Sequence, residues 1–196
     1  IANCLVGSEM CIRDRYNVAS SGLITGSGTS TITINPSSDF VHSTYYYVQI
    51  DADAFDDAAG NSYAGISDTT TLSFTTADET NPTISSFSPS DDATAVATNS
   101  NIVLNFSEAV DVETGNIVIY RTSDDSAVET IDVTDGSKVT GTGSTQITIN
   151  PGSDLAEQTS YYVQIAATAF DDSSINSYAG ITHKTTLTFT TADATA

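Results

Sequence analysis

The residues best suited to chemistry in this chain are side-chain oxygens gathered in two acidic loops. Each loop has two consecutive aspartates, and an asparagine follows four residues after the second of them. The candidate ligands are Asp56, Asp57 and Asn61 in the first loop and Asp171, Asp172 and Asn176 in the second. Ca²⁺ takes about six to eight oxygen ligands in a tolerant geometry, so turns of this composition suit it. We therefore predict Ca²⁺ as the candidate cofactor, although the EF-hand pattern is absent.

A second acidic group follows an apolar run later in the chain. Glu108 and Asp111 are its tentative calcium ligands. Asp78 and Asp193 stand at the expected domain junctions, where a bound ion would stiffen a series of domains. All these residues also have a simpler interpretation, because Asp and Asn favour turns by hydrogen-bonding to nearby backbone. The sequence leaves both interpretations open.

Two copies of one repeat must position these loops. Residues 140–193 repeat residues 25–78 without a gap, so that each residue aligns with the one 115 positions later, and roughly two thirds of the aligned residues are identical. Neither His42 nor His183 is kept in the other copy. The repeat therefore offers no shared base for a catalytic triad and no set of zinc ligands. We predict a chain without a catalytic site.

The composition excludes several classes of partner. Five Lys and Arg residues stand against 25 Asp and Glu residues, which gives a formal net charge of −20. A nucleic acid would be repelled by such a chain, so we predict no nucleic-acid partner. No apolar run approaches the roughly 18 residues that a membrane helix needs, so we predict no membrane span. Abundant Thr, Ser, Gly and Asn, with few long helix formers, indicate an all-β chain.

Residues 1–15 differ from everything that follows. They contain both cysteines, Cys4 and Cys11, and residues 10–14 (MCIRD) resemble the translation of a transposon-derived sequencing adapter. We interpret 1–15 as a non-native segment and exclude it from fold reasoning. On that interpretation the cysteines form neither a disulfide nor a metal site. The alternatives are a genuine N-terminal strand or the tail of a signal peptide.

The remaining chain divides into two domains of unequal completeness. Residues 16–78 are expected to be the C-terminal part of a repeat truncated at its N-terminus, which lacks the counterpart of 82–130. Residues 79–82 are the expected linker, and 83–193 the complete repeat. We therefore interpret the chain as a piece of a longer array.

Short punctuated apolar runs in the complete repeat predict about seven strands. The expected strands are 83–87, 101–106, 117–120, 128–133, 146–149, 161–167 and 185–190. This number of short strands, separated by turn residues within about 110 residues, is typical of an antiparallel β-sandwich.

A recurring tyrosine pattern sharpens that prediction. Leu155, Thr159, Tyr161 and Val163 resemble the start of strand F in fibronectin-type and immunoglobulin-like sandwiches, and Phe40, Thr44, Tyr46 and Val48 repeat the frame. Tyr161 and Tyr46 should then point inward and bond through their hydroxyls to the backbone of the preceding corner, as a tyrosine corner does. Tyr162 and Tyr47, one residue later, should face outward.

Several separated blocks resemble one family. They are PTI at 82–84, SP at 88–89, NIVLNFSEAV at 101–110, GNIVI at 115–119 and LTFTT at 187–191. Together they resemble the bacterial Ig-like domain first seen in surface-layer proteins. The resemblance implies tandem immunoglobulin-like β-sandwiches that act as non-catalytic spacers in secreted or cell-surface proteins, often adhesins. It also implies neighbouring Ig-like repeats as partners, with cell-surface or carbohydrate ligands bound through other domains.

Two alternative functions remain open at this point. The first is a carbohydrate- or protein-binding module in which Tyr47 and Tyr162, or Tyr63 and Tyr178, stack on a ligand. For Tyr63 and Tyr178, which stand in the repeated motif NSYAGI, a role in anchoring their loops is favoured. The second is an accessory domain of an extracellular enzyme. Both alternatives share the expected extracellular or bacterial cell-surface location.

Overall fold

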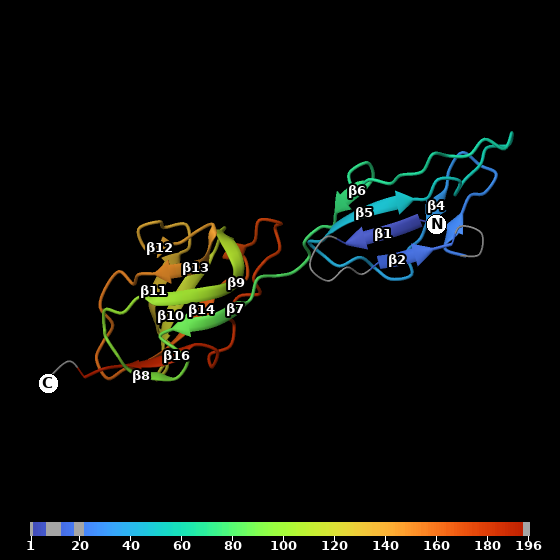
Figure 1. The fold of residues 1–196 in the computed structure, drawn as a ribbon. Coiled ribbons are helices and arrows are strands. Elements are labelled where there is room, and N and C mark those ends of the chain that lie inside the picture. The colour runs from blue at the N-terminus through green and yellow to red at the C-terminus, as the bar shows by residue number, and fades with distance from the viewer. Residues whose placement is uncertain (1, 7–12, 18–21, 194–196) are drawn as a thin grey trace. The chain divides into compact units, whose positions relative to one another are not determined.

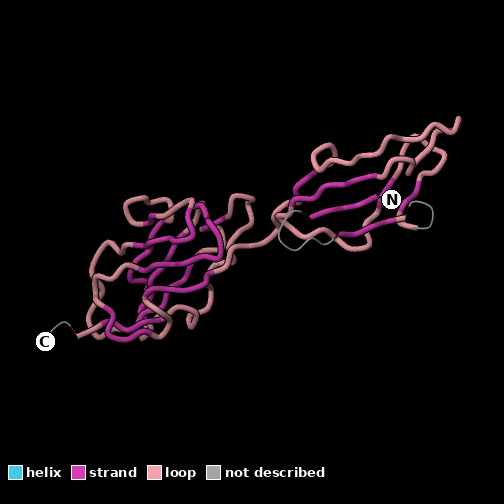
Figure 2. The backbone as a smooth tube through the Cα atoms, viewed as in Figure 1, coloured by secondary structure: helices cyan, strands magenta, loops and turns pink. Residues whose placement is uncertain are grey.

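The computed structural model describes the chain except for residues 1, 7–12, 18–21 and 194–196. The described residues form strands, turns and loops, as Figure 2 shows. None of their segments is a helix long and apolar enough to cross a membrane. The chain separates into two compact units, Ile1–Glu79 and Thr80–Ala196. The division falls inside the expected linker, 79–82.

The second unit is built from two facing sheets (Figure 1). One sheet has the strand order β11-β10-β14-β16-β8, and the other has β12-β13-β9-β15 with β7 also paired to β9. The strands are β7 (Ile84–Ser88), β8 (Ala93–Val96), β9 (Ile102–Val112), β10 (Asn116–Arg121), β11 (Ala127–Asp132), β12 (Val139–Thr140), β13 (Ser144–Ile149), β14 (Ser160–Ile165), β15 (Phe170–Asp171) and β16 (Thr188–Thr191).

Alternating apolar residues of both sheets make the core of this unit. Successive side chains of a strand point to opposite faces, so Ile102, Leu104 and Phe106 of β9 all point to one side, and all three are buried. Ile117 and Ile119 of β10 meet them from the other sheet in the same apolar cluster. The predicted sandwich is thus confirmed for the complete repeat, with antiparallel pairing throughout except between β8 and β16, which are parallel.

One expected boundary is wrong, with a consequence for the acidic residues. Strand β9 does not stop at 106 but runs on to Val112, so Glu108 and Asp111 lie in a strand rather than in a loop. The first part of β9 pairs with β13 and β7, and its end pairs with β15, where Asp171 faces Asp111. Because neighbouring strands satisfy its backbone, this polar stretch remains extended. Strands β8, β12 and β15 are too short to have been predicted from periodicity.

The tyrosine corners are confirmed in both units. The backbone N–H of Ala156 donates to the hydroxyl of Tyr161 at 2.9 Å, and that of Val41 donates to Tyr46 at 2.8 Å. Tyr162 lies outside the core cluster, as expected, but the expectation that it is exposed is wrong, because only 2 % of it is accessible. Its ring stacks on that of Tyr120, with 4.9 Å between the ring centroids. Neighbouring side chains therefore cover it.

The first unit contains one four-stranded sheet and a separate hairpin. The sheet has the order β2-β1-β5-β6, and β3 pairs only with β4 in the described part of the chain. These strands are β1 (Ala2–Val6), β2 (Arg13–Tyr16), β3 (Ile24–Thr25), β4 (Thr33–Ile34), β5 (Tyr45–Ile50) and β6 (Ser73–Thr75).

In the sheet of the first unit, the strands at residues 2–6 and 13–16 occupy positions equivalent to those of β10 and β11 in the second unit. Ala2 pairs with Ile50 and with Tyr16, and the residues 115 positions later pair in the same way. Strands equivalent to β10 and β11 are therefore present in the first unit, largely within the residues that the sequence indicates to be a non-native segment. The non-native origin of 1–15 stays a prediction, and so does the role of the cysteines, because Cys11 lies outside the described residues.

Candidate acidic site

Asp172 is the most constrained of the predicted calcium ligands. It follows β15 directly and is only 5 % exposed. One carboxylate oxygen accepts the backbone N–H groups of Ser174 and Asn176, both at 2.8 Å. The other oxygen accepts the side-chain amide of Asn176, also at 2.8 Å. This carboxylate therefore holds its own loop closed.

The first unit repeats the same arrangement in a more open setting. Asp57 accepts the backbone N–H groups of Ala59 and Asn61 on one oxygen and the Asn61 side-chain amide on the other, each at 2.8 Å. In both units the backbone N–H of the aspartate donates to the asparagine carbonyl, at 2.9 Å from Asp57 and at 3.0 Å from Asp172. The paired Asp and Asn form a loop clasp, which is the turn-based interpretation of these residues.

Hydrogen bonding sets the charge state of both clasps. In Asp172 burial raises the pKa, but the hydrogen bonds from Asn176 and Ser174 together outweigh it, so the pKa lies below its ordinary value. In Asp57 the side-chain hydrogen bond from Asn61 is the largest influence, and the pKa is again lowered. Both carboxylates are thus held in the ionised form that a cation would need.

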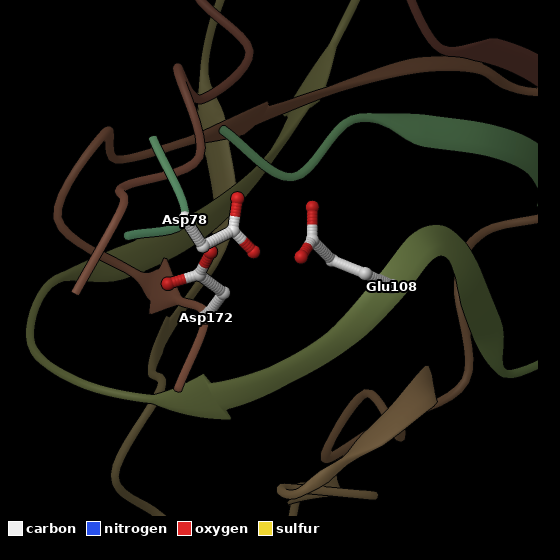
Figure 3. A group of neighbouring side chains, drawn as sticks. All are labelled: Asp78, Glu108 and Asp172. Atoms are coloured by element: carbon white, nitrogen blue, oxygen red, sulfur yellow. The ribbon is translucent and has the colours of Figure 1, made fainter. Parts of the chain in front are cut away.

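The structure brings one ligand of the second acidic group to the clasp. A carboxylate oxygen of Glu108 lies within 4.8 Å of one of Asp172, and Glu108 is half-buried. Figure 3 shows the side chains of Glu108, on β9, and Asp172, in the loop after β15. Two carboxylates so close together favour a cation between them, because their like charges repel. Two side chains fall short of the about six to eight oxygens of a calcium site, so backbone groups or water would have to complete it.

The other predicted ligands are placed elsewhere. Asp111 and Asp171 face each other across the β9–β15 pair, and Asp111 accepts a hydrogen bond of 3.1 Å from the hydroxyl of Thr142. Asp56 forms a backbone bridge with Ser62 and is exposed. Within each loop the consecutive aspartates therefore have separate roles, since one pairs along the backbone and the next closes the clasp.

The two histidines have no catalytic setting among the described residues. His42 is exposed and lies 3.6 Å from the carboxylate of Glu79. His183 is exposed in the loop before β16, where its carbonyl accepts the backbone N–H of Thr186.

Of the tyrosines considered for ligand stacking, Tyr162 and Tyr178 are buried. Tyr178 is 8 % exposed and packs edge-on against Phe106 of β9, with 5.3 Å between the ring centroids. Burial raises the pKa of Tyr178 to about 12. The expected loop-anchoring role is confirmed here, and the stacking role proposed for Tyr178 and Tyr162 is wrong. Tyr63, its counterpart in the first copy, is 43 % exposed.

A polar cluster over Tyr162 was not predicted. The hydroxyl of Tyr162 donates to Asp125 at 3.1 Å, and Lys184 donates to the other oxygen of Asp125 at 2.6 Å. The Lys184 ammonium also lies 5.6 Å from the centre of the Tyr162 ring. The cluster joins residues 59 positions apart. Neither Asp125 nor Lys184 recurs in the first copy, so the sequence carries no signal for it.

Two sheets packed face to face, antiparallel except for the β8–β16 pair, and a tyrosine corner at the start of β14 define the second unit as an immunoglobulin-like β-sandwich. The first unit repeats the corner and much of the strand order. The family model described as bacterial Ig-like domain matches residues 7–76 and again residues 78–191. The chain therefore belongs to the bacterial Ig-like domain family and carries this domain twice. Compared with curated proteins, it has no significant match.

Proposed function

We propose that the chain is a non-catalytic, load-bearing spacer of a bacterial secreted or cell-surface protein, with neighbouring repeats of the same chain as its partners. The observation that carries the proposal is the pairing of β8 with β16, which is parallel. One strand lies near the start of the second unit and the other at its end. A force that enters at residue 80 and leaves at residue 193 loads this pair in shear, so several contacts must break together.

Hydrogen bonds on both sides reinforce the β8–β16 pair. The N–H of Ala192 donates to the carbonyl of Val96 at 2.7 Å, and the N–H of Asp92 donates to the carbonyl of Thr188 at 2.8 Å. The N–H of Thr188 in turn donates to the Asp91 carboxylate at 2.9 Å. Each of these bonds crosses between the two ends of the repeat. The arrangement suits a module whose task is to resist extension.

Single-molecule stretching of the full chain tests the proposal. We expect the second unit to unfold in one step that releases roughly 35–40 nm of chain, because a fully extended residue spans about 3.5 Å. Ala192→Pro removes the donor to Val96 and should lower the unfolding force while leaving the released length unchanged. The matched control is Ala77→Pro, because Ala77 aligns with Ala192 but lies in the first unit, outside the β8–β16 pair. An Ala192→Pro variant as resistant as the parent chain would refute the load-bearing role.

The second part of the proposal is that Ca²⁺ stiffens the module at Glu108 and Asp172. The support is the proximity of the two carboxylates and the ionised state of Asp172. Full-chain unfolding should be measured with millimolar Ca²⁺ and with Mg²⁺ as the control cation. A hundredfold excess over the dissociation constant corresponds to about 2.7 kcal/mol of added stability.

Charge-neutralising variants separate a calcium site from general screening. Glu108→Gln should abolish the calcium-specific gain, whereas Glu113→Gln, which removes the same charge from an exposed position just beyond β9, should retain it. The calcium site would be refuted if Ca²⁺ and Mg²⁺ stabilised the chain equally, or if both variants gained the same stability from Ca²⁺. The acidic residues would then serve only to close the loop clasp.

A further inference from the structure

The outward face of the sheet that contains β14 has an aromatic pair beside a hollow in the surface of the second unit. Tyr120 of β10 and Tyr162 of β14 are directly opposite each other across the two strands. Their rings stack with an angle of 11° between the planes. The core cluster includes the adjacent side chains Ile119 and Tyr161 but neither of these two rings. Since successive side chains alternate between the faces of a sheet, the pair lies on the face turned away from the core.

Tyr120 is the ring of this pair that a ligand can reach. It is half-buried, whereas Tyr162 is almost fully covered. On the side away from β14, the residue opposite Tyr120 is Ala127 of β11, which is exposed and too small to cover an aromatic ring. In the described part of the chain, no protein group hydrogen-bonds to the Tyr120 hydroxyl. One ring face and one hydroxyl are therefore available on this surface.

The polar cluster over Tyr162 holds the aromatic pair in place. The Tyr162 hydroxyl and the Lys184 ammonium donate to the two oxygens of Asp125. The side chains of Lys184 and Asp125 are 56 % and 55 % exposed, so each retains capacity for further hydrogen bonds. A ring that is already fixed by its neighbours loses little freedom when a ligand binds, which favours affinity.

A hollow of about 430 Å³ adjoins the aromatic pair. Thr188, which is opposite Tyr162 on β16, lines it, and so does Thr122, two residues after Tyr120. The volume falls within the range of about 300–1,000 Å³ that is usual for small-molecule sites. The residues with hydroxyl groups that line it on or beside β8, β10, β14 and β16 are Thr94, Thr122, Ser160, Thr188 and Thr190. Since a hydroxyl both donates and accepts, this lining suits a ligand that is itself rich in hydroxyls.

We propose that this face of the second unit binds a neutral oligosaccharide, with one sugar ring packed on Tyr120 and the next sugars directed past Lys184 and Asp125 to the hollow. The C–H groups on one face of a sugar ring are weakly positive and match the negative face of an aromatic ring. The sugar hydroxyls match the ammonium, the carboxylate and the hydroxyls of the hollow. A polyanion would be repelled by the net charge of −20, which favours an uncharged ligand.

Titration of the full chain with cellohexaose, laminarihexaose and maltohexaose, followed by amide chemical shifts, tests the proposal. We expect at least one of the three to give saturable shift changes confined to 118–127, 160–164 and 184–190. Because the ligand carries no charge, its affinity should be the same at low and at moderate salt. Absence of saturable changes with all three oligosaccharides, or changes located elsewhere, would overturn the proposal.

Substitutions separate ring stacking from a general effect on the fold. Tyr120→Ala should weaken binding at least tenfold, whereas Tyr120→Phe, which keeps the ring face, should weaken it less. Lys184→Ala changes an exposed side chain and should weaken binding severalfold. The matched control is Tyr45→Ala, which removes a 40 % exposed tyrosine of the first unit and should leave the affinity unchanged. Equal affinities of the parent chain and the Tyr120→Ala variant would contradict the site.

A competing occupant is tested in the same titration. Proline-rich peptides also bind to surfaces that present aromatic rings, so a proline-rich decapeptide serves as the comparison ligand. We expect the oligosaccharide to shift the amides around Tyr120 and the peptide to leave them unchanged. Saturable shifts with the peptide and none with the oligosaccharides would assign the surface to a protein partner and would overturn the proposal.

Discussion

Replacing Leu187 with alanine should destabilise the second unit far more than Leu72→Ala destabilises the first. The two leucines align, and the carbonyl of each accepts a backbone N–H from the adjacent strand, from Val163 at 3.0 Å and from Val48 at 2.8 Å. Their surroundings differ, because Leu187 is fully buried and Leu72 is 41 % exposed. The pair of substitutions therefore isolates burial from local sequence and backbone geometry.

The expected magnitudes follow from the buried area of each side chain. Leu→Ala removes three carbons, and at about 0.8 kcal/mol per buried CH₂ the transfer part alone is about 2.4 kcal/mol. A cavity in a closed core adds to this, so Leu187→Ala should cost about 3–4 kcal/mol. For Leu72 the exposed fraction reduces the transfer part to about 1–1.5 kcal/mol, and an open site adds no closed cavity.

Native-state hydrogen exchange of the full chain measures both effects in one experiment. The amides of Val163 and Val48 report on the two equivalent backbone pairs, so each unit has its own probe. We expect a large loss of protection at Val163 in the first variant and a small loss at Val48 in the second. Equal losses, or a larger loss at Val48, would show that the apparent difference in burial does not govern the stability of the units.

Three further predictions concern polar groups of the second unit. Tyr161→Phe leaves the N–H of Ala156 without its acceptor and should cost about 1–3 kcal/mol in denaturant unfolding; an unchanged midpoint would contradict the corner bond. Asp172 has a pKa lowered by folding, so its stabilising contribution is present above its unfolded value of about 3.8 and is lost as pH falls through the lowered pKa. The free energy of unfolding, measured as a function of pH, should therefore fall below pH 3.8, and it should fall less in the Asp172→Asn variant. An identical decrease in the variant would argue against the clasp. Tyr178 has a pKa raised to about 12, so the unfolded chain releases this proton first and stability should fall as pH rises from about 10 towards 12. The Tyr178→Phe variant should lose less stability over this pH range. An unchanged decrease in the variant would contradict the burial of the hydroxyl.

Local patterns predicted the features of this fold that depend on local chemistry. The corner tyrosines Tyr46 and Tyr161 could be assigned because the side-chain period of a strand and a short corner fix both the direction of the ring and the reach of the hydroxyl. The predicted strands of the complete repeat are present for the same reason. For the acidic loops, the sequence could not separate an ion site from a backbone clasp, since both require clustered oxygen atoms.

Features that depend on distant neighbours were the ones that sequence missed. Tyr162 lies on the outer side of its sheet as alternation requires, but Tyr120 covers it, so alternation alone predicted exposure wrongly. Strand β9 continues past residue 106 because β15 pairs with its polar end. The proximity of Glu108 to Asp172 arises from that continuation. In each case the deciding partner lies at least 40 residues away in the chain.

The sequence by itself determined the repeat, the family and the tyrosine that closes each corner. These properties rest on short-range spacing, which is the same in both copies. Only the tertiary structure decided which of the shared side chains are buried, because burial in the second unit depends on β9, which lies between β13 and β15. Where β9 is present, Leu187 and Tyr178 are buried in a closed core. In the first unit the aligned Leu72 and Tyr63 are 41 % and 43 % exposed.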